Sequence, residues 1–324
     1  MSLFGARASG ETHDQRDRQE ASQRSLEQGG LPLNAVDRLR AQAARQGTPG
    51  QLFTSDLSVN ELALTRETGY EPLGQVMGSS VYHVGWQWMP MSSWSSGELT
   101  IMTEAFYQAR HRALDRLRQE AQLLGATGVV GVHLEHKEYE WGPAMLEFAA
   151  IGTAIRETPA VGQGAPGTSD AAPTPFLSDL SGQDFWKLRQ AGFQPVGIAV
   201  GNCSYYQVPT WNTRSVTQGS LFFGGWVNQE LPDYTQALYN ARGLAMERMS
   251  REARAAGAQG VVGVTVDVDV TPIERGSERN RRIDMLYHFT AIGTAIAPTA
   301  APPPSAGGPA ALGRLTFMPA VALK

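Results

Sequence analysis

The sequence is short of cysteine and of charge, and each shortage excludes a class of protein. Its single cysteine, Cys203, excludes intramolecular disulfides and zinc sites built on paired cysteines. Charged residues make up 18% of the chain, and 27 Lys and Arg stand against 31 Asp and Glu, a net charge of −4. This balance argues against nucleic acid as a partner, because phosphate binding requires a basic surface.

Long apolar runs and catalytic motifs are also missing. A membrane helix needs about 20 apolar residues, whereas the most apolar window, Leu221–Val227, is short and contains two glycines. The first 15 residues lack the apolar stretch of a secretory signal. No set of nucleophile, base and orienting residue is recognisable. We therefore predict a cytoplasmic protein without a membrane span, and one that is not an enzyme.

What the sequence does contain is an internal duplication. The matching blocks, first copy with second, are Ser55–Tyr82 with Ser178–Tyr205, Glu98–Val132 with Glu230–Val264, and Phe148–Ile155 with Phe289–Ile296. In the middle block about half of the aligned positions are identical. The second copy is longer only between blocks, where loops accept extra residues at little cost. The repeat indicates two copies of one module of about 100 residues.

Composition divides the chain into five parts. Residues 1–50 are rich in Gln, Arg, Glu and Gly and have few large apolar side chains, which predicts a mostly disordered region in which a short helix over Ala35–Arg45 is compatible with the sequence. The two modules occupy residues 51–156 and 176–297. An Ala/Pro/Gly-rich linker, residues 157–175, joins them, and a Pro/Ala-rich tail, residues 298–324, follows.

Each copy predicts the order α-β-α-β-β. Ser58 and Ser181, each followed three residues later by an acidic residue, mark the start of a short helix that Gly69 or Gly192 ends. Apolar residues at spacings of three and four predict one long helix over about Thr100–Leu124, with a stripe made of Met102, Phe106, Ala109, Ala113, Leu117, Ala121 and Leu124.

The predicted fold class is therefore α/β (α+β), with two tandem copies of a small mixed sheet packed on a long helix. A right-handed crossover makes the first two strands of each module parallel, and the third strand antiparallel to the second. Three strands leave sheet edges that must be covered or paired. We expect the two copies to pair with each other and the chain to associate further into a homo-oligomer.

These residues resemble a known family, the YbjQ-like family described as putative heavy-metal-binding. The blocks that carry the resemblance are Glu98-Leu99, Ala109-Arg110, Leu124-Gly125-Ala126, Val129–Val132 and Ala150–Ile155, and apart from Leu124 they return in the second copy. The resemblance covers both modules and implies a small α/β domain that assembles into rings, typically pentamers. It also implies a metal site. The tandem copies and long tails of this chain depart from the single-domain form of the family.

The implied metal site has one set of candidate ligands. His133 and Glu135 share one face of a predicted strand in the first copy, as Asp267 and Asp269 do in the second. Glu135 aligns with Asp267, so an acidic position recurs at which oxygen ligands could hold a hard cation. The alternative is the solvated outer face of a hairpin. Soft metals prefer thiolate and imidazole, but Cys203 aligns with Ser80 and the six histidines form no paired motif.

Aromatic residues crowd into two loops and form the second candidate site, an interaction surface. The candidates are Trp86, Trp88 and Trp94 in the first copy and Trp211, Phe222 and Trp226 in the second. Exposed aromatic clusters mark contact surfaces for proteins or ligands. The alternative is that these side chains pack over the sheet or between the two copies.

Charged and tyrosine residues kept in both copies of the long helix form the third candidate site. They are Tyr107, Arg110, Arg116 and Glu120, with Tyr239, Arg242, Arg248 and Glu252 as their counterparts. Arg116 and Glu120 are four residues apart, so an ion pair along the helix would explain them. An interface between subunits or an anion pocket is the alternative.

Taken together, the sequence predicts a non-enzymatic oligomeric binding or scaffold protein that forms a ring-like homo-oligomer. The aromatic loops and the tails would contact a protein partner. The alternative is a metal-ion or small-ligand binder in which assembly is incidental. No cofactor is predicted apart from that metal ion.

Overall fold

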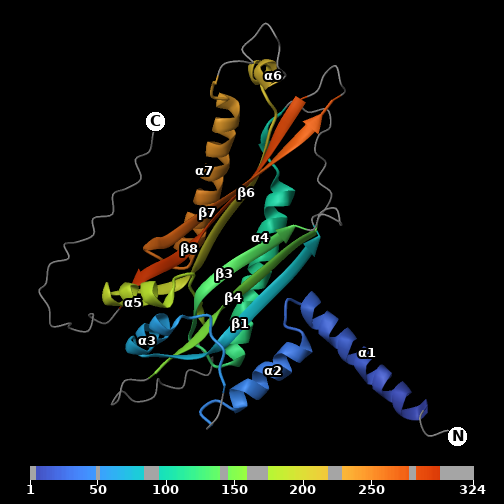
Figure 1. Ribbon diagram of the computed structural model, residues 1–324, viewed down its shortest axis with the longest axis vertical. Helices are drawn as coiled ribbons and strands as arrows, with labels where there is room; N and C mark the ends of the chain where they lie inside the picture. Colours follow the sequence, from blue (N-terminus) through green and yellow to red (C-terminus); the bar gives the residue numbers. More distant parts are fainter. Residues whose placement is uncertain are drawn as a thin grey trace, which may run out of the picture.

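The computed structural model describes residues 5–48, 52–83, 95–138, 145–158, 174–217, 228–276 and 282–299. Two modules of the same design follow each other along the chain, and in each a long helix lies across a twisted sheet (Figure 1). Within the described ranges no helix is both long enough and apolar enough to cross a membrane.

The first module has the predicted order of helices and strands, with one additional short strand before the long helix. Its elements are α3 (Val59–Glu67), β1 (Tyr70–His83), β2 (Gly97–Glu98), α4 (Thr100–Leu123), β3 (Gly128–Glu138) and β4 (Met145–Glu157). Both β1 and β3 pair antiparallel with β4, which lies between them. As predicted, β1 and β3 therefore run in the same direction and β4 runs opposite to them.

The second module repeats this arrangement. Its elements are β5 (Phe176–Leu177), α5 (Gly182–Gln190), β6 (Phe193–Gln207), α6 (Trp211–Thr217), α7 (Pro232–Ala255), β7 (Gly260–Arg275) and β8 (Arg282–Pro298). β8 lies between β6 and β7 and is antiparallel to both. The α+β class and the duplication predicted from the sequence are confirmed.

Local sequence explains where the short helices begin and end. Ser58 accepts a hydrogen bond from the backbone of Glu61 and donates its own backbone N–H to the Glu61 carboxylate, which closes a capping box. Ser181 caps α5 by accepting from the backbone of Asp184. Both helices are followed by a glycine at positive φ, Gly69 and Gly192, a conformation that other residues rarely adopt.

Two glycines set how closely the long helices approach the sheets. A Cβ atom built on Gly78 of β1 would collide with the backbone of α4 at Ala113, and one built on Gly201 of β6 would collide with α7 at Ala245. The predicted apolar stripe faces these strands, because Ala109, Ala113 and the residues that follow at helical spacing are buried. The alanines and glycines together allow backbone-to-backbone packing in each module.

The first 50 residues differ from the prediction of a mostly disordered region. They contain α1 (Gly5–Glu27) and α2 (Leu33–Ala44), which form an N-terminal arm (residues 5–44) beside the first module (Figure 1). Leu31 and Leu39 are buried with the core residues of that module. The arm is ordered because these two leucines find a partner surface that composition alone does not reveal.

The remaining two predicted parts fall mostly outside the described residues. Of the linker 157–175, the stretch 159–173 is not described, and of the tail 298–324 only residues 298 and 299 are described. The boundaries of the modules at 51–156 and 176–297 stay predictions.

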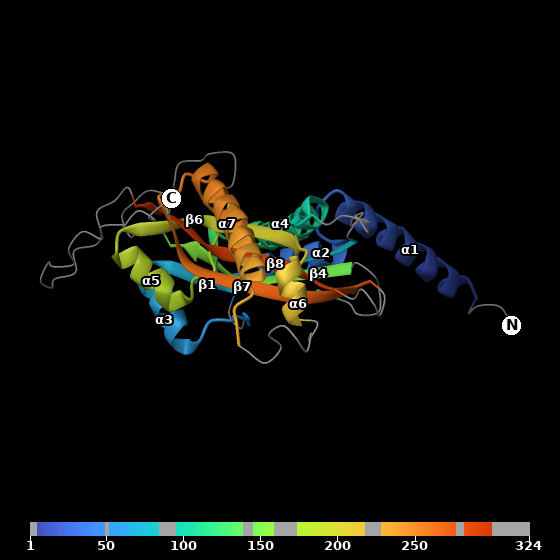
Figure 2. The same cartoon turned by 90° about the horizontal axis from the view of Figure 1, so that it is seen from above.

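Helices α3 and α5 lie side by side at one end of the molecule, opposite α1 (Figure 2).

Candidate assembly interface

Each module lends a short strand to the sheet of the other. β5, at the start of the second module, pairs parallel with β3 of the first module through Gly128 and Val129. β2, which precedes the long helix of the first module, pairs antiparallel with β6 through Tyr205 and Tyr206. Both sheets therefore have four strands, and the fourth strand always comes from the other module. The predicted pairing of sheet edges between the copies is confirmed.

Helix α4 continues this contact along the edge of β6. Leu99 donates its N–H to the carbonyl of Ser204 at 2.8 Å, and Ser204 donates its own N–H to Thr103 Oγ1 at 3.0 Å. The Asn202 amide donates to the carbonyl of Thr103 at 2.8 Å. All three polar side chains are buried. Helix α4 therefore covers a polar strand edge whose backbone groups need partners.

Two charged residues of α7 bind both their own strand and the first module. Arg248 donates to the carbonyl of Asn202 at 2.9 Å and forms an ion pair with Glu98, with Nη1 and Oε1 2.7 Å apart. Burial opposes ionisation of Glu98, but the hydrogen bond and charge of Arg248 outweigh it, so the pKa of Glu98 lies below its usual value.

Glu252 has the same double role. Its Oε2 accepts the N–H of Val200 at 3.2 Å and lies 3.6 Å from Nε2 of His111 on α4. The carboxylate thus holds the strand of its own module on one side and faces the neighbouring helix on the other.

Arg110 fills the centre of the junction. It is 3% exposed, its guanidinium lies 5.1 Å from the centre of the Phe148 ring, and Nη2 donates to Oγ1 of Thr290 in the second module at 3.2 Å. Burial lowers the pKa of Arg110 to about 10. Beside it, Phe106 stacks on His288 of the second module with ring centres 4.9 Å apart. A buried cation on an aromatic face is stabilised by the ring quadrupole.

A third contact joins the two short helices. α3 and α5 approach so closely that a Cβ atom on Gly182 would lie 2.8 Å from Cβ of Glu61. Phe185 of α5 is fully buried against the first module, where its ring meets that of Tyr70 edge-on at 5.3 Å. The junction therefore has an apolar anchor at this end and polar contacts along α4.

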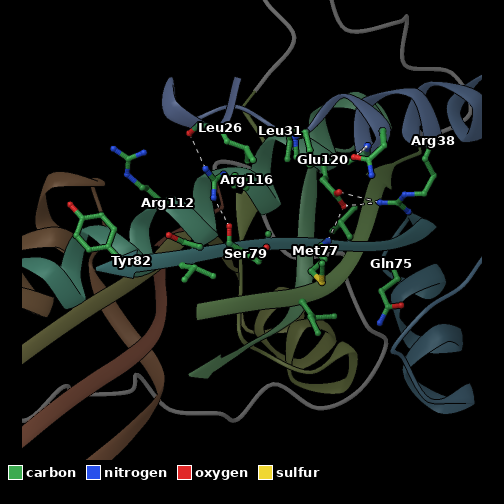
Figure 3. Close-up of a pocket in the computed structure, with 18 of the residues that line it drawn as sticks. Leu26, Leu31, Arg38, Gln75, Met77, Ser79, Tyr82, Arg112, Arg116 and Glu120 are labelled. Carbon is green, nitrogen blue, oxygen red and sulfur yellow. Dashed lines mark hydrogen bonds and ion pairs between the residues drawn. The ribbon is translucent and has the colours of Figure 1, made fainter. Parts of the chain in front are cut away.

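In the first module the N-terminal arm binds the residues that correspond to Arg248 and Glu252 (Figure 3). Arg116 donates to the carbonyl of Ser79 at 2.6 Å, as Arg248 does to Asn202, and also to the carbonyls of Leu26 and Gly30, each at 3.1 Å.

Glu120 takes the place of Glu252. It accepts the N–H of Met77 at 2.9 Å and pairs with Arg38 of α2 at 3.1 Å (Figure 3). Burial raises the pKa of Glu120, while Met77 and Arg38 oppose that rise.

Of the four repeated helix positions, two bind other segments in both copies and two differ between the copies. Arg116 and Arg248 each bind a neighbouring segment of the same chain and their own strand, as described above, and the interface between subunits stays a prediction. Tyr107 packs on His111 with ring centres 4.0 Å apart, whereas its counterpart Tyr239 is exposed. Arg242, the counterpart of the buried Arg110, is also exposed.

The four predicted metal ligands lie on strands of different sheets. His133 and Glu135 are exposed on β3, where Nδ1 of His133 is 3.5 Å from Oδ2 of Asp56, and Asp267 and Asp269 are exposed on β7. In the part of the chain that the structure describes, no three His, Cys, Asp or Glu side chains gather as a metal site requires. Burial raises the pKa of Cys203 to about 12, and its charged form, the one that binds metals, is therefore disfavoured.

Of the aromatic candidates, Trp211 alone falls within the described ranges, and it is exposed at the start of α6. Trp86, Trp88, Trp94, Phe222 and Trp226 lie outside these ranges. The contact surface predicted for the two loops stays a prediction.

Sequence reasoning missed the polar contacts of α4 and the whole role of the arm. Thr103 recurs as Thr235, and this repetition could have marked it as a contact residue. Its partners Asn202 and Ser204 are not repeated, because they align with Ser79 and Val81. Their partners belong to a different module, and the duplication gave no hint of them. Arg38 has no counterpart in the second copy at all.

Fold and contacts together define a class: a tandem α+β protein whose modules exchange edge strands and are joined head to tail. The chain belongs to the YbjQ family, described as "Putative heavy-metal-binding", whose model matches residues 65–158 and 214–298. The resemblance noted from the sequence is thereby confirmed.

Three relatives show how the match is distributed. The chain is 44% identical over 212 residues to the "Encapsulin nanocompartment protein Rv1762c" of Mycobacterium tuberculosis, which covers 65% of this chain and 76% of that protein. It is 37% identical over 76 residues to a UPF0145 protein of Methanoregula boonei, covering 24% and 62%. It is 36% identical over 103 residues to a UPF0145 protein of Archaeoglobus fulgidus, covering 31% and 93%. None of these names states a reaction.

Proposed function

We propose that this protein is a non-enzymatic scaffold that assembles by repeating, between chains, the junction that joins its two modules. The observation that carries the proposal is that surfaces of the first module are buried at the junction, whereas their counterparts on the second module are exposed. Val132 of β3 is 4% exposed, whereas its counterpart Val264 of β7 is 39% exposed. Arg110 and Arg242 show the same contrast.

The outer strand β7 offers the first of these surfaces. β3, its counterpart, receives β5 and the carbonyls of Ser178 and Leu180, which accept the N–H groups of Val132 and Gly131. On β7 the valines 264, 266, 268 and 270 are exposed. An exposed apolar edge strand is a template for pairing with another chain. Residues 53–54, which align with β5, would supply the added strand from a second copy.

Helix α7 offers the second surface. Its first half carries Thr235, Leu238 and Arg242 where α4 carries the buried Thr103, Phe106 and Arg110. In the second copy none of these three positions is fully buried. The face with which α4 covers β6 is thus present again on α7 and lacks a cover within the described part of the chain.

A contact between two different surfaces repeats in one direction. Such a head-to-tail contact closes into a ring when the rotation between neighbours allows it, and otherwise grows as a filament. We propose the ring-like homo-oligomer, located in the cytoplasm. Two comparisons support a role in assembly: a relative at 44% identity is named as an encapsulin nanocompartment protein, and shorter relatives match about one module each.

Native mass spectrometry of the full chain across a concentration series tests the proposal. We expect masses at multiples of 35.0 kDa at micromolar concentration, and we expect Arg242→Glu to shift the population to the monomer without changing its thermal unfolding. Arg254→Glu, an exposed change on the same helix beyond the contact face, is the matched control. A wild-type chain that stays monomeric, or an Arg242→Glu variant that assembles as well as the control, contradicts the proposal.

A further inference from the structure

We infer that the N-terminal arm is an internal competitor of assembly: it occupies on the first module the surface that a second copy of this chain binds, and it is displaced when that copy docks. The inference rests on the proposed function, because the second copy would dock through α7. Its basis is one arginine and one glutamate that recur in both modules. In the second module Arg248 and Glu252 contact the first module, whereas in the first module Arg116 and Glu120 contact the arm.

The two covered surfaces correspond bond by bond. Arg248 holds the strand carbonyl of its own module and then Glu98 of the neighbouring module. Arg116 holds the equivalent strand carbonyl and then two carbonyls of the arm. A second copy would bring Glu230, the exposed counterpart of Glu98, to Arg116. Nη2 of Arg248 donates to Glu98, whereas Nη2 of Arg116 donates to the carbonyl of Leu26, so the arm occupies the place that the carboxylate of a second copy would take.

The acidic partner makes the same point. Glu252 and Glu120 each accept the backbone N–H of the strand beside them, from Val200 and Met77. Beyond that bond, Glu252 faces His111 of α4 and Glu120 faces Arg38 of α2. Helix α2 therefore stands where a neighbouring long helix would stand.

The arm covers this surface only in part. A groove of about 1030 Å³ remains between the arm and β1, lined by Leu26, Met77, Val81 and Arg112 among others (Figure 3). Met77 is 49% exposed and Val81 61% exposed, whereas their counterparts under α4, Val200 and Ser204, are buried. A neighbouring module would thus bury more of β1 than the arm does.

Sequence differences between the two copies determine how well a second copy competes with the arm for the first module. Where α4 has His111, α7 has Gly243, and where the second module offers the Thr290 hydroxyl to Arg110, the first module has Ala149. A second copy would therefore make fewer polar bonds on the first module than α4 makes on the second. The contact of a second copy with the first module would thus bury more surface than the arm does but would make fewer hydrogen bonds than α4 makes on the second module. A small helical arm can compete with such a contact.

One substitution separates the arm from the interface. Arg38→Glu places a carboxylate beside Glu120 and repels α2, but it leaves every residue of the second copy's contact face unchanged. The affinity of a site rises with the fraction of molecules in which it is open, so we expect Arg38→Glu to lower the concentration at half-assembly about tenfold. Arg24→Glu, a change on the exposed face of α1, is the matched control and should assemble like the wild type.

Hydrogen exchange provides the second measurement. We expect amides of residues 33–44 to exchange faster in assembled wild-type protein than in its monomer, with amides of 200–206 equally protected in both. An unchanged or higher half-assembly concentration for Arg38→Glu, or an arm that is equally protected on assembly, overturns the inference. If Arg242→Glu still prevents assembly in that case, the proposed function stands without it. A chain that never assembles in any variant overturns both.

Discussion

Arg248 on α7 reaches across the junction to Glu98, the residue that ends β2, with Nη1 and Oε1 2.7 Å apart. Both side chains are largely buried, and the same arginine also binds the carbonyl of Asn202. One guanidinium therefore connects its own strand to the neighbouring module through the charge of one carboxylate.

Glu98→Gln should weaken the junction within the chain. The change removes a charge-assisted hydrogen bond, and we expect the free energy of unfolding to fall by about 2 kcal/mol. Glu247→Gln, which breaks the exposed pair with Arg251, should cost less than about 1 kcal/mol. Denaturant unfolding of the two variants measures the difference, and equal losses would show that the Glu98 pair contributes no more than a surface pair.

The same pair predicts a dependence on pH. Because the pKa of folded Glu98 is lowered, its stabilising contribution is complete above the usual glutamate value of about 4.3 and is lost as the pH falls through the lowered pKa. The wild type should therefore lose stability below that value more steeply than Glu98→Gln. Parallel unfolding curves for the two proteins over this range would contradict the assignment.

Cys203 lies in this junction and can report on its opening. Its pKa of about 12, raised by burial and by the neighbouring Glu98, means that the reactive thiolate is about a thousandfold rarer than for a free cysteine. We expect a thiol reagent at pH 8 to label the folded protein much more slowly than the unfolded chain, because the thiolate is rare and the side chain is buried. Because the chain has a single cysteine, one mass increment follows the reaction. Comparable rates for folded and unfolded protein would show that Cys203 is accessible.

Gly201→Ala should separate α7 from its sheet. The added methyl group meets the backbone of α7 at Ala245 and Met249, which has no means of turning away, and overpacking of this kind costs about 1–3 kcal/mol. Gly197→Ala on the same strand is the control, because its Cβ would have no atom within 4 Å. Thermal unfolding of the two variants gives the comparison, and an equal melting temperature would refute close packing at Gly201.

Val264→Asp tests the exposed edge of β7. Val264 corresponds to the buried Val132, so a carboxylate there would be desolvated in the assembly and not in the single chain. We expect association at least about tenfold weaker, which corresponds to about 1.4 kcal/mol, with unchanged unfolding of the monomer. Val270→Asp, further along the same strand and also exposed, should have a smaller effect. Sedimentation velocity measures both, and equal effects would place the contact elsewhere on β7.

The sequence allowed the module to be predicted because its determinants are local. Ser58 and Ser181 cap helices within three residues, and the alanine stripe of α4 follows from spacing along one helix. The surroundings of Arg110 could not be predicted in this way, because its partner Thr290 is far away in the sequence. Arg110 and Arg242 are the same residue in the same helical position, and only contacts between modules make one buried and the other exposed.

The arm illustrates a different limit. Composition describes residues 1–50 as polar, and this is accurate, yet Leu31 and Leu39 pack on the first module and Arg38 pairs with Glu120, so the arm is ordered where a surface is available. Whether a polar segment folds depends on the area that it can cover on its neighbour as well as on its own hydrophobicity.

Because the module is duplicated within one chain, the number of modules in any closed assembly of whole chains is even. Every subunit contributes two modules, so a ring in which all modules take part contains an even number of them, and a five-membered ring of modules cannot be closed by whole chains. Around a ring with an even number of modules, junctions within a chain would alternate with junctions between chains, and only the latter can open. Dissociation would then always occur at every second contact and release intact pairs.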